Sequence, residues 1–480
     1  MGSDRNQEGQ GVNRDDTESP ESAGASAGGF GALIRQVRGP VFLPGDDGYD
    51  AERAGYQTGV QQRPAVIVGA AGAADVRAAV GFAGAHGLPV AVQATGHGLS
   101  IPAAGGVLIS TRRMTAVRVD AGIRTAWIEA GVRWQHVIAA ATPHGLAPLS
   151  GSAPDVGAVA YTLGGGLGLL ARRYGYAADH VRSIEVVTAD ARLRHVTAER
   201  DPDLFWAIRG GRDNFGVVTG LQIDLVPVTR LYGGGLFFAA DRVADVLHAY
   251  RNWTSTVPDE LTTAVALIPL PDNPAIPAPI RNRYVAHIRI AYTGAAAAGE
   301  RLVAPLRAIG PRLMDTLGDM SYAASGSIFN DPTEPAAYYG TNAMLREFDA
   351  SAAPIVLDLA GPDAPVPCVV DLRHLGGALS RPPTVSNAVG RRDASYLLSV
   401  LTPLAASDID SVRPVHHRLY EALAPWITGQ YLNFRYGENA TTEQVRAAYD
   451  PDDYQRLTEL KAVYDPTNMF RLNYNIPPAD

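Results

Sequence analysis

The sequence has a single cysteine, Cys368, and a single lysine, Lys461, among its 480 residues. One cysteine excludes an internal disulfide, and the apolar neighbours of Cys368 are typical of a small core residue. One lysine leaves little room for an enzyme that works through a lysine Schiff base. No metal-ligand spacing of cysteine and histidine occurs either. The sequence therefore argues against disulfide scaffolds and zinc sites.

The sequence also lacks any run of roughly 18 apolar residues, so no transmembrane helix is predicted. Its first residues have no apolar segment of a secretory signal, and their Ser, Gly, Asp and Glu content predicts a disordered tail over 1–29. The net charge of −8 and the pI of about 5.8 disfavour nucleic acid and anionic membrane as partners. We therefore expect a cytoplasmic protein that acts on small molecules.

Strands and helices alternate in the first half of the chain, which predicts an α/β or α+β lobe. Apolar runs predict strands at 64–69, 88–92, 107–110, 117–120 and 125–130, and helical spacing predicts helices over 74–85 and 134–141. After Pro227 the same reasoning predicts strands at 236–239, 262–268, 284–292 and 367–372, helices over 243–253 and 295–309, and a proline-rich loop at 270–282. A chain of this length exceeds one typical core, so two lobes are expected.

Three glycine-rich loops follow apolar strands in this first half. They read VQATGHGLSI at 92–101, SGSAPDVGAVAYTLGGGLG at 150–168 and WAIRGGRDNFGVVTG at 206–220. Glycine on both sides of His97 lets the backbone approach a bound group and offer N–H groups to phosphate oxygens. The alternative is a tight turn with a surface histidine.

In this order, and together with YLNF at 431–434 and LKAVYDPTNMFRLNYNIPP at 460–478, these loops resemble the FAD-binding domain of the vanillyl-alcohol oxidase (PCMH-type) superfamily, in its berberine-bridge-enzyme-like branch. The resemblance spans roughly residues 40 to 478. It implies an α+β fold, with a two-lobed FAD-binding domain and a substrate domain that has an antiparallel sheet backed by helices. We expect an N-terminal part of the FAD domain at 30–228, the substrate domain at 229–424 and a returning C-terminal segment at 425–480.

The resemblance implies FAD as the cofactor, because the family's matching histidine is bonded covalently to the flavin 8α-methyl group. The cofactor contacts that it implies, besides His97, are Ala94, Thr95, Gly96, Gly98, Leu99, Ser100, Gly151, Ala153, Val156, Gly157, Gly164, Gly165, Gly168, Gly216, Val218, Asn433 and Asn475. Many relatives have a cysteine at the position of Ala153 that forms a second bond, at flavin C6. Alanine cannot, so a single histidyl attachment is expected.

The family's acid–base tyrosine, at the end of a YxNY motif, is replaced here by Phe434, which has no ionisable group. Tyr474, Tyr431 and Tyr161 are the candidate replacements, and each is also a plausible core or packing aromatic. Tyr474 is our first choice, because its motif belongs to the same C-terminal segment as Phe434.

On the expected strand at 284–292, alternation puts His287 and Arg289 on one face, where they would suit an acidic or poly-oxygenated substrate. Arg381 and Arg391 are further candidates for substrate binding, although surface ion pairing is the favoured interpretation of any one arginine.

The predicted function is therefore an FAD-dependent oxidoreductase of small-molecule, specialised metabolism, which transfers a hydride to flavin N5 and is reoxidised by O₂. An oxygenase or a cyclase of natural-product biosynthesis is the alternative, since both the cysteine and the YxNY tyrosine are missing. A flavoprotein that binds a ligand without turnover is a third interpretation, against which the intact His97 loop argues.

Overall fold

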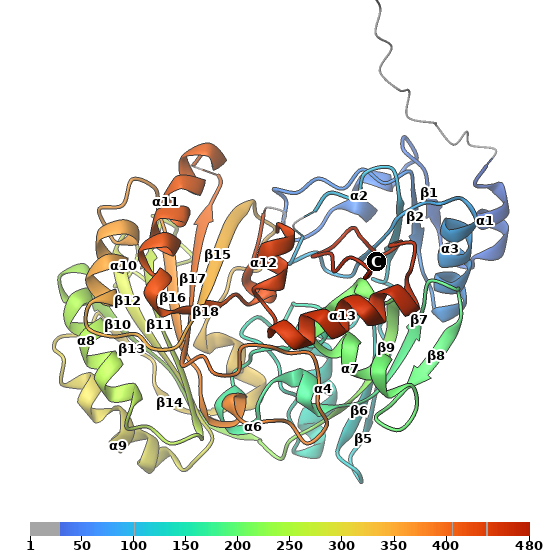
Figure 1. Cartoon of the computed structure of the whole chain (residues 1–480). Coiled ribbons are helices and arrows are strands. Elements are labelled where there is room, and N and C mark those ends of the chain that lie inside the picture. Colours follow the sequence, from blue (N-terminus) through green and yellow to red (C-terminus); the bar gives the residue numbers. More distant parts are fainter. Residues whose placement is uncertain (1–28, 100, 406, 438–439) are drawn as a thin grey trace, which may run out of the picture.

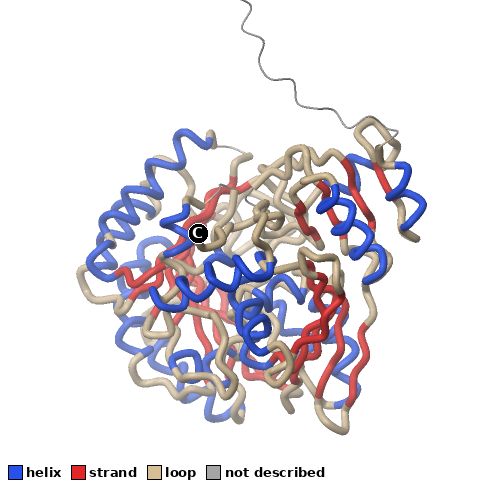
Figure 2. The backbone as a smooth tube through the Cα atoms, turned by 45° about the vertical axis from the view of Figure 1, so that its right-hand side comes forward, coloured by secondary structure: helices blue, strands red, loops and turns tan. Residues whose placement is uncertain are grey.

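The computed structural model describes residues 29–99, 101–405, 407–437 and 440–480. The tail expected at 1–29 lies outside this range apart from Gly29, and so does Ser100, one of the expected cofactor contacts. The described chain forms two lobes, with the N-terminal lobe on the right of Figure 1 and the large sheet on the left. In Figure 2 the strands of the two lobes stand apart, with loops between them in the upper part. No helix in these residues is both long and apolar enough to cross a bilayer.

The N-terminal lobe contains two sheets. The first has the order β1 (Val41–Phe42), β2 (Val66–Gly69), β4 (Val107–Ser110), β3 (Val90–Gln93), and its last three strands are parallel. The second is antiparallel, with the order β5 (Val117–Asp120), β6 (Thr125–Glu129), β9 (Val217–Asp224), β7 (Val181–Val187), β8 (Leu193–Val196). The helices of this lobe are α1 (Gly31–Gln36), α2 (Tyr49–Arg53), α3 (Ala73–Ala85), α4 (Trp134–Ala141), α5 (Ala158–Leu163), α6 (Ala171–Tyr174) and α7 (Pro202–Gly211). The strands and helices expected between 64 and 141 are confirmed, with ends shifted by at most two residues.

The second lobe is built on one antiparallel sheet. Its order is β13 (Met314–Asp315), β10 (Arg230–Ala239), β12 (Tyr284–Tyr292), β11 (Leu261–Pro269), β16 (Val369–His374), β17 (Tyr396–Pro403), β15 (Tyr338–Leu345), β18 (Ile427–Gly429), with β14 (Gly318–Ser321) also paired to β10. One face is covered by helices α8 (Val243–Thr254), α9 (Ala296–Arg307), α10 (Ala352–Ala360) and α11 (Ile409–Ala422), which lie on the outer side in Figure 1. The antiparallel sheet backed by helices is thus as expected, and the strands expected after Pro227 are present.

Strand β10 is longer than the sequence predicts, because it includes Gly233, Gly234 and Gly235. Glycine is unusual inside a strand unless something approaches the backbone closely. Here a Cβ on Gly235 would lie 2.1 Å from Nε2 of His287, so the glycine makes room for that imidazole ring.

The C-terminal segment returns to the N-terminal lobe through α12 (Thr442–Arg446) and α13 (Pro451–Tyr464). Its anchor is Lys461, whose side chain is completely buried and pairs with Asp465 at 2.7 Å. The same ammonium donates hydrogen bonds to the carbonyl oxygens of Asn214 and Phe470. Burial lowers the pKa of Lys461, and the Asp465 carboxylate opposes that shift. The chain's one lysine therefore joins the C-terminal segment to the loop that precedes β9.

We predict that Lys461→Met lowers the free energy of unfolding by about 3–5 kcal/mol, because it leaves the buried Asp465 carboxylate without its counter-charge. Urea unfolding followed by circular dichroism measures this. The matched control is Arg230→Met, which removes an exposed ion pair with Asp319 and should cost only a small fraction of that loss, because solvent screens exposed pairs. Equal losses in the two variants would contradict the anchoring role.

Candidate active site

A cavity of about 460 Å³ lies between the lobes. One wall is formed by the loops at 94–99 and 151–157 of the N-terminal lobe, and the opposite wall by the exposed face of β16 and β17. Residues 431–434 of the returning segment also line it. A volume of this size is typical of cofactor and small-molecule sites.

His97 lies in the first loop with both ring nitrogens in contact. Its Nδ1 is 2.8 Å from Oγ1 of Thr95, and its Nε2 is 3.3 Å from a carboxylate oxygen of Asp155. Tyr56 stacks on the imidazole with ring centroids 4.0 Å apart. The hydroxyl of Tyr338 donates to the backbone oxygen of His97. The ring is therefore fixed in orientation: the loop does turn at His97 and Gly98, as the alternative expected, but the histidine has partners on several sides.

Both neighbours of the imidazole are polar. Oγ1 of Thr95 accepts from the backbone N–H of Gly157 and forms a hydrogen bond with Nδ1, in which either atom can be the donor. Nε2 faces the Asp155 carboxylate but has no hydrogen-bond partner among the described residues. Burial alone would raise the pKa of the Asp155 carboxyl, but its contact with His97 and the nearby charge of Arg133 hold that pKa below its usual range.

The returning segment is held over the cavity by amide side chains. Asn342 of β15 donates to the backbone oxygen of Tyr431 and accepts from its N–H. Asn433 donates to the backbone oxygen of Tyr161 and accepts from Arg212 at 2.9 Å. Because a Cβ on Gly164 would lie only 2.0 Å from Oδ1 of Asn433, this contact requires glycine at 164.

The structure brings together most of the residues expected to bind cofactor. Those that line the cavity are Ala94, Thr95, Gly96, His97, Gly98, Leu99, Gly151, Ala153, Val156, Gly157 and Asn433. Gly164, Gly165, Gly168, Gly216, Val218 and Asn475 do not line it. A side chain at Gly216 would meet the carbonyl oxygen of Val187 at 2.5 Å, and Val218 is a core residue of β9. The four glycines of this group thus allow close packing of the surrounding chain, since a Cβ at any of them would lie 3.0 Å or less from a neighbouring atom.

The three candidate tyrosines separate in the structure. Tyr161 and Tyr431 line the cavity, whereas Tyr474 is buried outside its lining and its hydroxyl donates to the backbone oxygen of Arg435. The choice of Tyr474 as first candidate is thus not supported by its position. Burial raises the pKa of the Tyr161 and Tyr431 hydroxyls well above the usual value. Both phenols are therefore proton-bearing hydrogen-bond donors at neutral pH rather than bases.

Of the four residues expected to bind substrate, only Arg289 lines the cavity. His287 is on the predicted face, but its ring is buried and stacks on the ring of Phe237, with the two centroids 3.8 Å apart. Burial, together with the charge of Arg289, lowers the pKa of His287 well below the usual value. Arg381 pairs with Asp259 at the surface, and Arg391 bonds the carbonyl oxygen of Ala447. These three residues are not part of the cavity, because partners elsewhere in the fold hold them.

Sequence reasoning missed several side chains in the cavity lining, namely Tyr56, Tyr338, Tyr436, Arg212 and Arg373. Tyr436 follows Phe434 by two residues, so reading on along the YLNF motif would have found it. Arg373 comes directly after the strand expected at 367–372 and belongs to β16 in the structure, but the positions of its neighbours across the sheet depend on strand order.

The cavity has the features that a polar heteroaromatic cofactor requires. Oε1 of Gln93 and the hydroxyl of Tyr161, which both belong to lining residues, are buried without a hydrogen-bond partner among the described residues. Buried polar atoms of this kind normally have partners. Glycine at 96 lets the loop pack closely on the preceding segment, since a Cβ there would lie 2.5 Å from Cα of Gly55. Among the described residues no group of His, Cys, Asp and Glu could hold a metal ion.

Comparison with known proteins agrees with this geometry. The FAD binding domain family matches residues 64–197, and the berberine and berberine-like family matches residues 430–477. The (R)-6-hydroxynicotine oxidase of Paenarthrobacter nicotinovorans is 29% identical over 92% of this chain and 97% of its own. Chitooligosaccharide oxidase of Gibberella zeae is 23% identical over 93% and 94%. The crystal structure of 6-hydroxy-D-nicotine oxidase from Arthrobacter nicotinovorans superimposes with a TM-score of 0.80 at 25% identity, covering 92% of this chain and 98% of that one.

We predict that Gly164→Ala weakens flavin binding, because the added methyl group must displace the Asn433 side chain from Tyr161 and Arg212. Overpacking of this kind costs about 1–3 kcal/mol. The ratio of bound flavin to protein after purification and dialysis measures the effect. Gly72→Ala is the matched control, since nothing lies within 4 Å of its added Cβ. Full flavin content in Gly164→Ala would contradict the prediction.

Proposed function

We propose that the chain is an FAD-linked oxidoreductase of the berberine-bridge-enzyme-like branch, which oxidises a small-molecule substrate in the cavity between its lobes, with O₂ as the final electron acceptor. The observation that carries the proposal is the convergence of two glycine-rich loops, the fixed His97 ring and a polar sheet face on one cavity. Bound FAD supplies hydride acceptance at its N5 atom. The residues of the chain supply binding, orientation and exclusion of water.

We assign the cofactor end of the cavity to the loops at 94–99 and 151–157, with Asn433 closing over it. Backbone N–H groups around Gly96 and Gly98 are available to polar atoms of the cofactor, and Tyr56 covers one face of the His97 ring. The substrate end then faces β16 and β17, where Val369, Asp371 and Leu401 line the cavity.

Tyr161 and Tyr431 face this same space. Because burial keeps both phenols protonated, we assign them the role of hydrogen-bond donors that orient a carbonyl or hydroxyl oxygen. Phe434 lines the cavity between the two ends and offers only an apolar ring. The absence of the family's tyrosine at this position favours a substrate whose oxidation needs no strong base from residue 434.

We further propose that FAD is attached covalently, through His97 alone. Ala153 lines the cavity at the position where many relatives carry a second attaching cysteine, and an alanine has no nucleophile. Asp155 acts as a positioning residue: a proton on Nε2 faces its carboxylate, and the electron pair of Nδ1 then faces the Thr95 hydroxyl, which must release it. Nucleophilic attack requires that electron pair.

We expect His97→Ala to leave only dissociable flavin, and Asp155→Asn to lower the fraction of covalently attached flavin at least tenfold, because an amide orients the imidazole less strongly than a carboxylate does. In-gel flavin fluorescence after acid precipitation, and the intact mass of the protein, measure attachment. The control Asp452→Asn changes an exposed carboxylate in the first turn of α13 and should leave attachment unchanged. A colourless acid pellet from flavin-loaded wild-type protein would exclude the covalent bond.

The experiment that tests the overall function is anaerobic reduction. Substrates named for the relatives, 6-hydroxynicotine and chitooligosaccharides, form the first panel, extended by other alcohols and amines. An oxidoreductase loses its visible flavin band when its substrate is added without O₂, and it recovers the band with H₂O₂ release on aeration. Product formed without bleaching would identify a cyclase, and ligand binding with neither change would identify a non-catalytic binder.

A further inference from the structure

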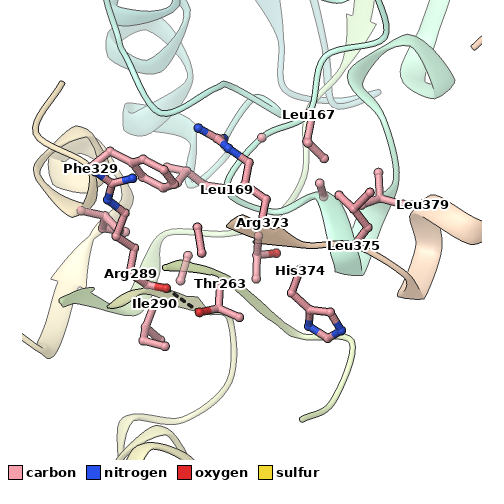
Figure 3. Close-up of a pocket in the computed structure, with 16 residues that line it drawn as sticks. Leu167, Leu169, Thr263, Arg289, Ile290, Phe329, Arg373, His374, Leu375 and Leu379 are labelled. Carbon is pink, nitrogen blue, oxygen red and sulfur yellow. Dashed lines mark hydrogen bonds between the residues drawn. The ribbon is translucent and has the colours of Figure 1, made fainter. Parts of the chain in front are cut away.

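Two arginine side chains rise from one row of the large sheet. Arg289 of β12 and Arg373 of β16 both pair with Ala264 of the strand between them. In Figure 3 they point to the same side of the sheet, whereas Ile290 and His374 point to the other. The small side chain of Ala264 leaves the space above it to the two guanidinium groups.

One carboxylate bridges the two arginines. Oδ1 of Asp371 accepts from Arg289 at 2.9 Å and Oδ2 accepts from Arg373 at 2.6 Å. Arg289 is buried and its Nε is bonded to His287, so it is held from two directions. Burial lowers its pKa, although Asp371 opposes the shift, and a guanidinium remains charged at any accessible pH. Asp371 therefore shares its single charge between two cations.

Arg373 has three close neighbours among the described residues. Its Nε donates to Asp371, and its guanidinium carbon lies 4.8 Å from the ring centroid of Phe329 and 4.6 Å from that of Phe434. No described residue accepts a hydrogen bond from its two terminal nitrogens. Arg373 lines the cavity, so this pair of donors is the part of the side chain that a bound molecule can reach.

A second carboxylate in the cavity, Asp331, acts on the cluster from a distance. It raises the pKa of both arginines electrostatically, yet none of its oxygens lies within ion-pair distance of either. The two arginines and the two carboxylates, Asp331 and Asp371, balance in charge, so the net charge of the cluster does not indicate which ligand binds. The two terminal nitrogens of Arg373 do indicate it, because their parallel N–H groups match the two oxygens of a carboxylate.

We propose that the substrate carries a carboxylate, which the terminal nitrogens of Arg373 bind while Asp371 and Arg289 hold that guanidinium in place. This assignment rests on the proposed function, because it locates the substrate at the end of the cavity opposite the His97 loop. Phe434 takes part as well: its ring packs on the guanidinium and, unlike a tyrosine, offers no hydroxyl that would compete for the fork.

Flavin-loaded protein tests this with benzoate and its neutral isostere benzamide, whose binding is followed through perturbation of the visible flavin spectrum. Benzoate should bind at least tenfold more tightly than benzamide, a difference of about 1.4 kcal/mol. Arg373→Met should abolish this preference, and Arg373→Lys should restore part of it, since lysine keeps the charge but not the fork. The control Arg418→Met lies on the exposed side of α11 and should change neither affinity.

The variant Asp331→Asn distinguishes a ligand-binding role of Arg289, Asp371 and Arg373 from a purely structural one. Removing that carboxylate should tighten benzoate binding and leave benzamide unchanged, whereas a merely structural cluster would give no selective change. Equal affinity for benzoate and benzamide in wild-type protein, or unchanged preference in a folded Arg373→Met, overturns the proposal. A protein that fails to bind FAD at all contradicts the proposed function instead, so the two failures are distinguishable.

Discussion

The buried ammonium group of Lys461 is the contact on which the cavity depends. It joins α13 to the carbonyl oxygens of Asn214 and Phe470, and Asp465 balances its charge. Asn214 extends the same junction, because its side chain bonds the backbone of Tyr474 and Ile476. This junction lies at the centre of the contacts that fix the C-terminal segment on the N-terminal lobe, together with the bonds of Asn433 to Tyr161 and Arg212. That segment carries residues 431–434, so the anchor also constrains the roof of the cavity.

The two walls of the cavity are made in different ways. The wall formed by the N-terminal loops includes several glycines, at 96, 98, 151 and 157, and behind it the contact between Gly164 and Asn433 exists only because residue 164 has no side chain. The opposite wall is the face of an antiparallel sheet, where every second residue of β16 points inward, as Val369, Asp371 and Arg373 do. A wall with these glycines suits a cofactor that is common to the family. On the wall made of side chains, a single substitution changes the contacts with the bound molecule. We therefore expect relatives with different substrates to differ on this wall.

This difference also explains what the sequence could and could not predict. The cofactor loops were predictable, because a glycine motif is a local signal and the residues from Ala94 to Leu99 line the cavity together. Alternation placed His287 and Arg289 on the correct face of β12, but it could not reveal that Phe237 and Gly235 enclose the imidazole ring. The role of Arg373 depends on the insertion of β11 between β12 and β16, which is a property of strand order rather than of spacing.

The position of Arg373 next to Phe434 offers a physical reason for phenylalanine, rather than tyrosine, at residue 434. A phenol at this point would lie beside the Arg373 guanidinium, whereas Phe434 packs its ring against that cation. Among the other phenols of the cavity, Tyr161 and Tyr431 are held protonated by burial, so they add donors and no base. The cavity thus receives hydrogen-bond donors from α5, from the returning segment and from Arg373 of β16. Such an environment stabilises an oxygen that already bears negative charge better than it removes a proton from a neutral alcohol. Phenylalanine at residue 434 and the two terminal nitrogens of Arg373, which bond no described residue, therefore act in the same direction: both make the site better suited to an anionic group than to proton removal.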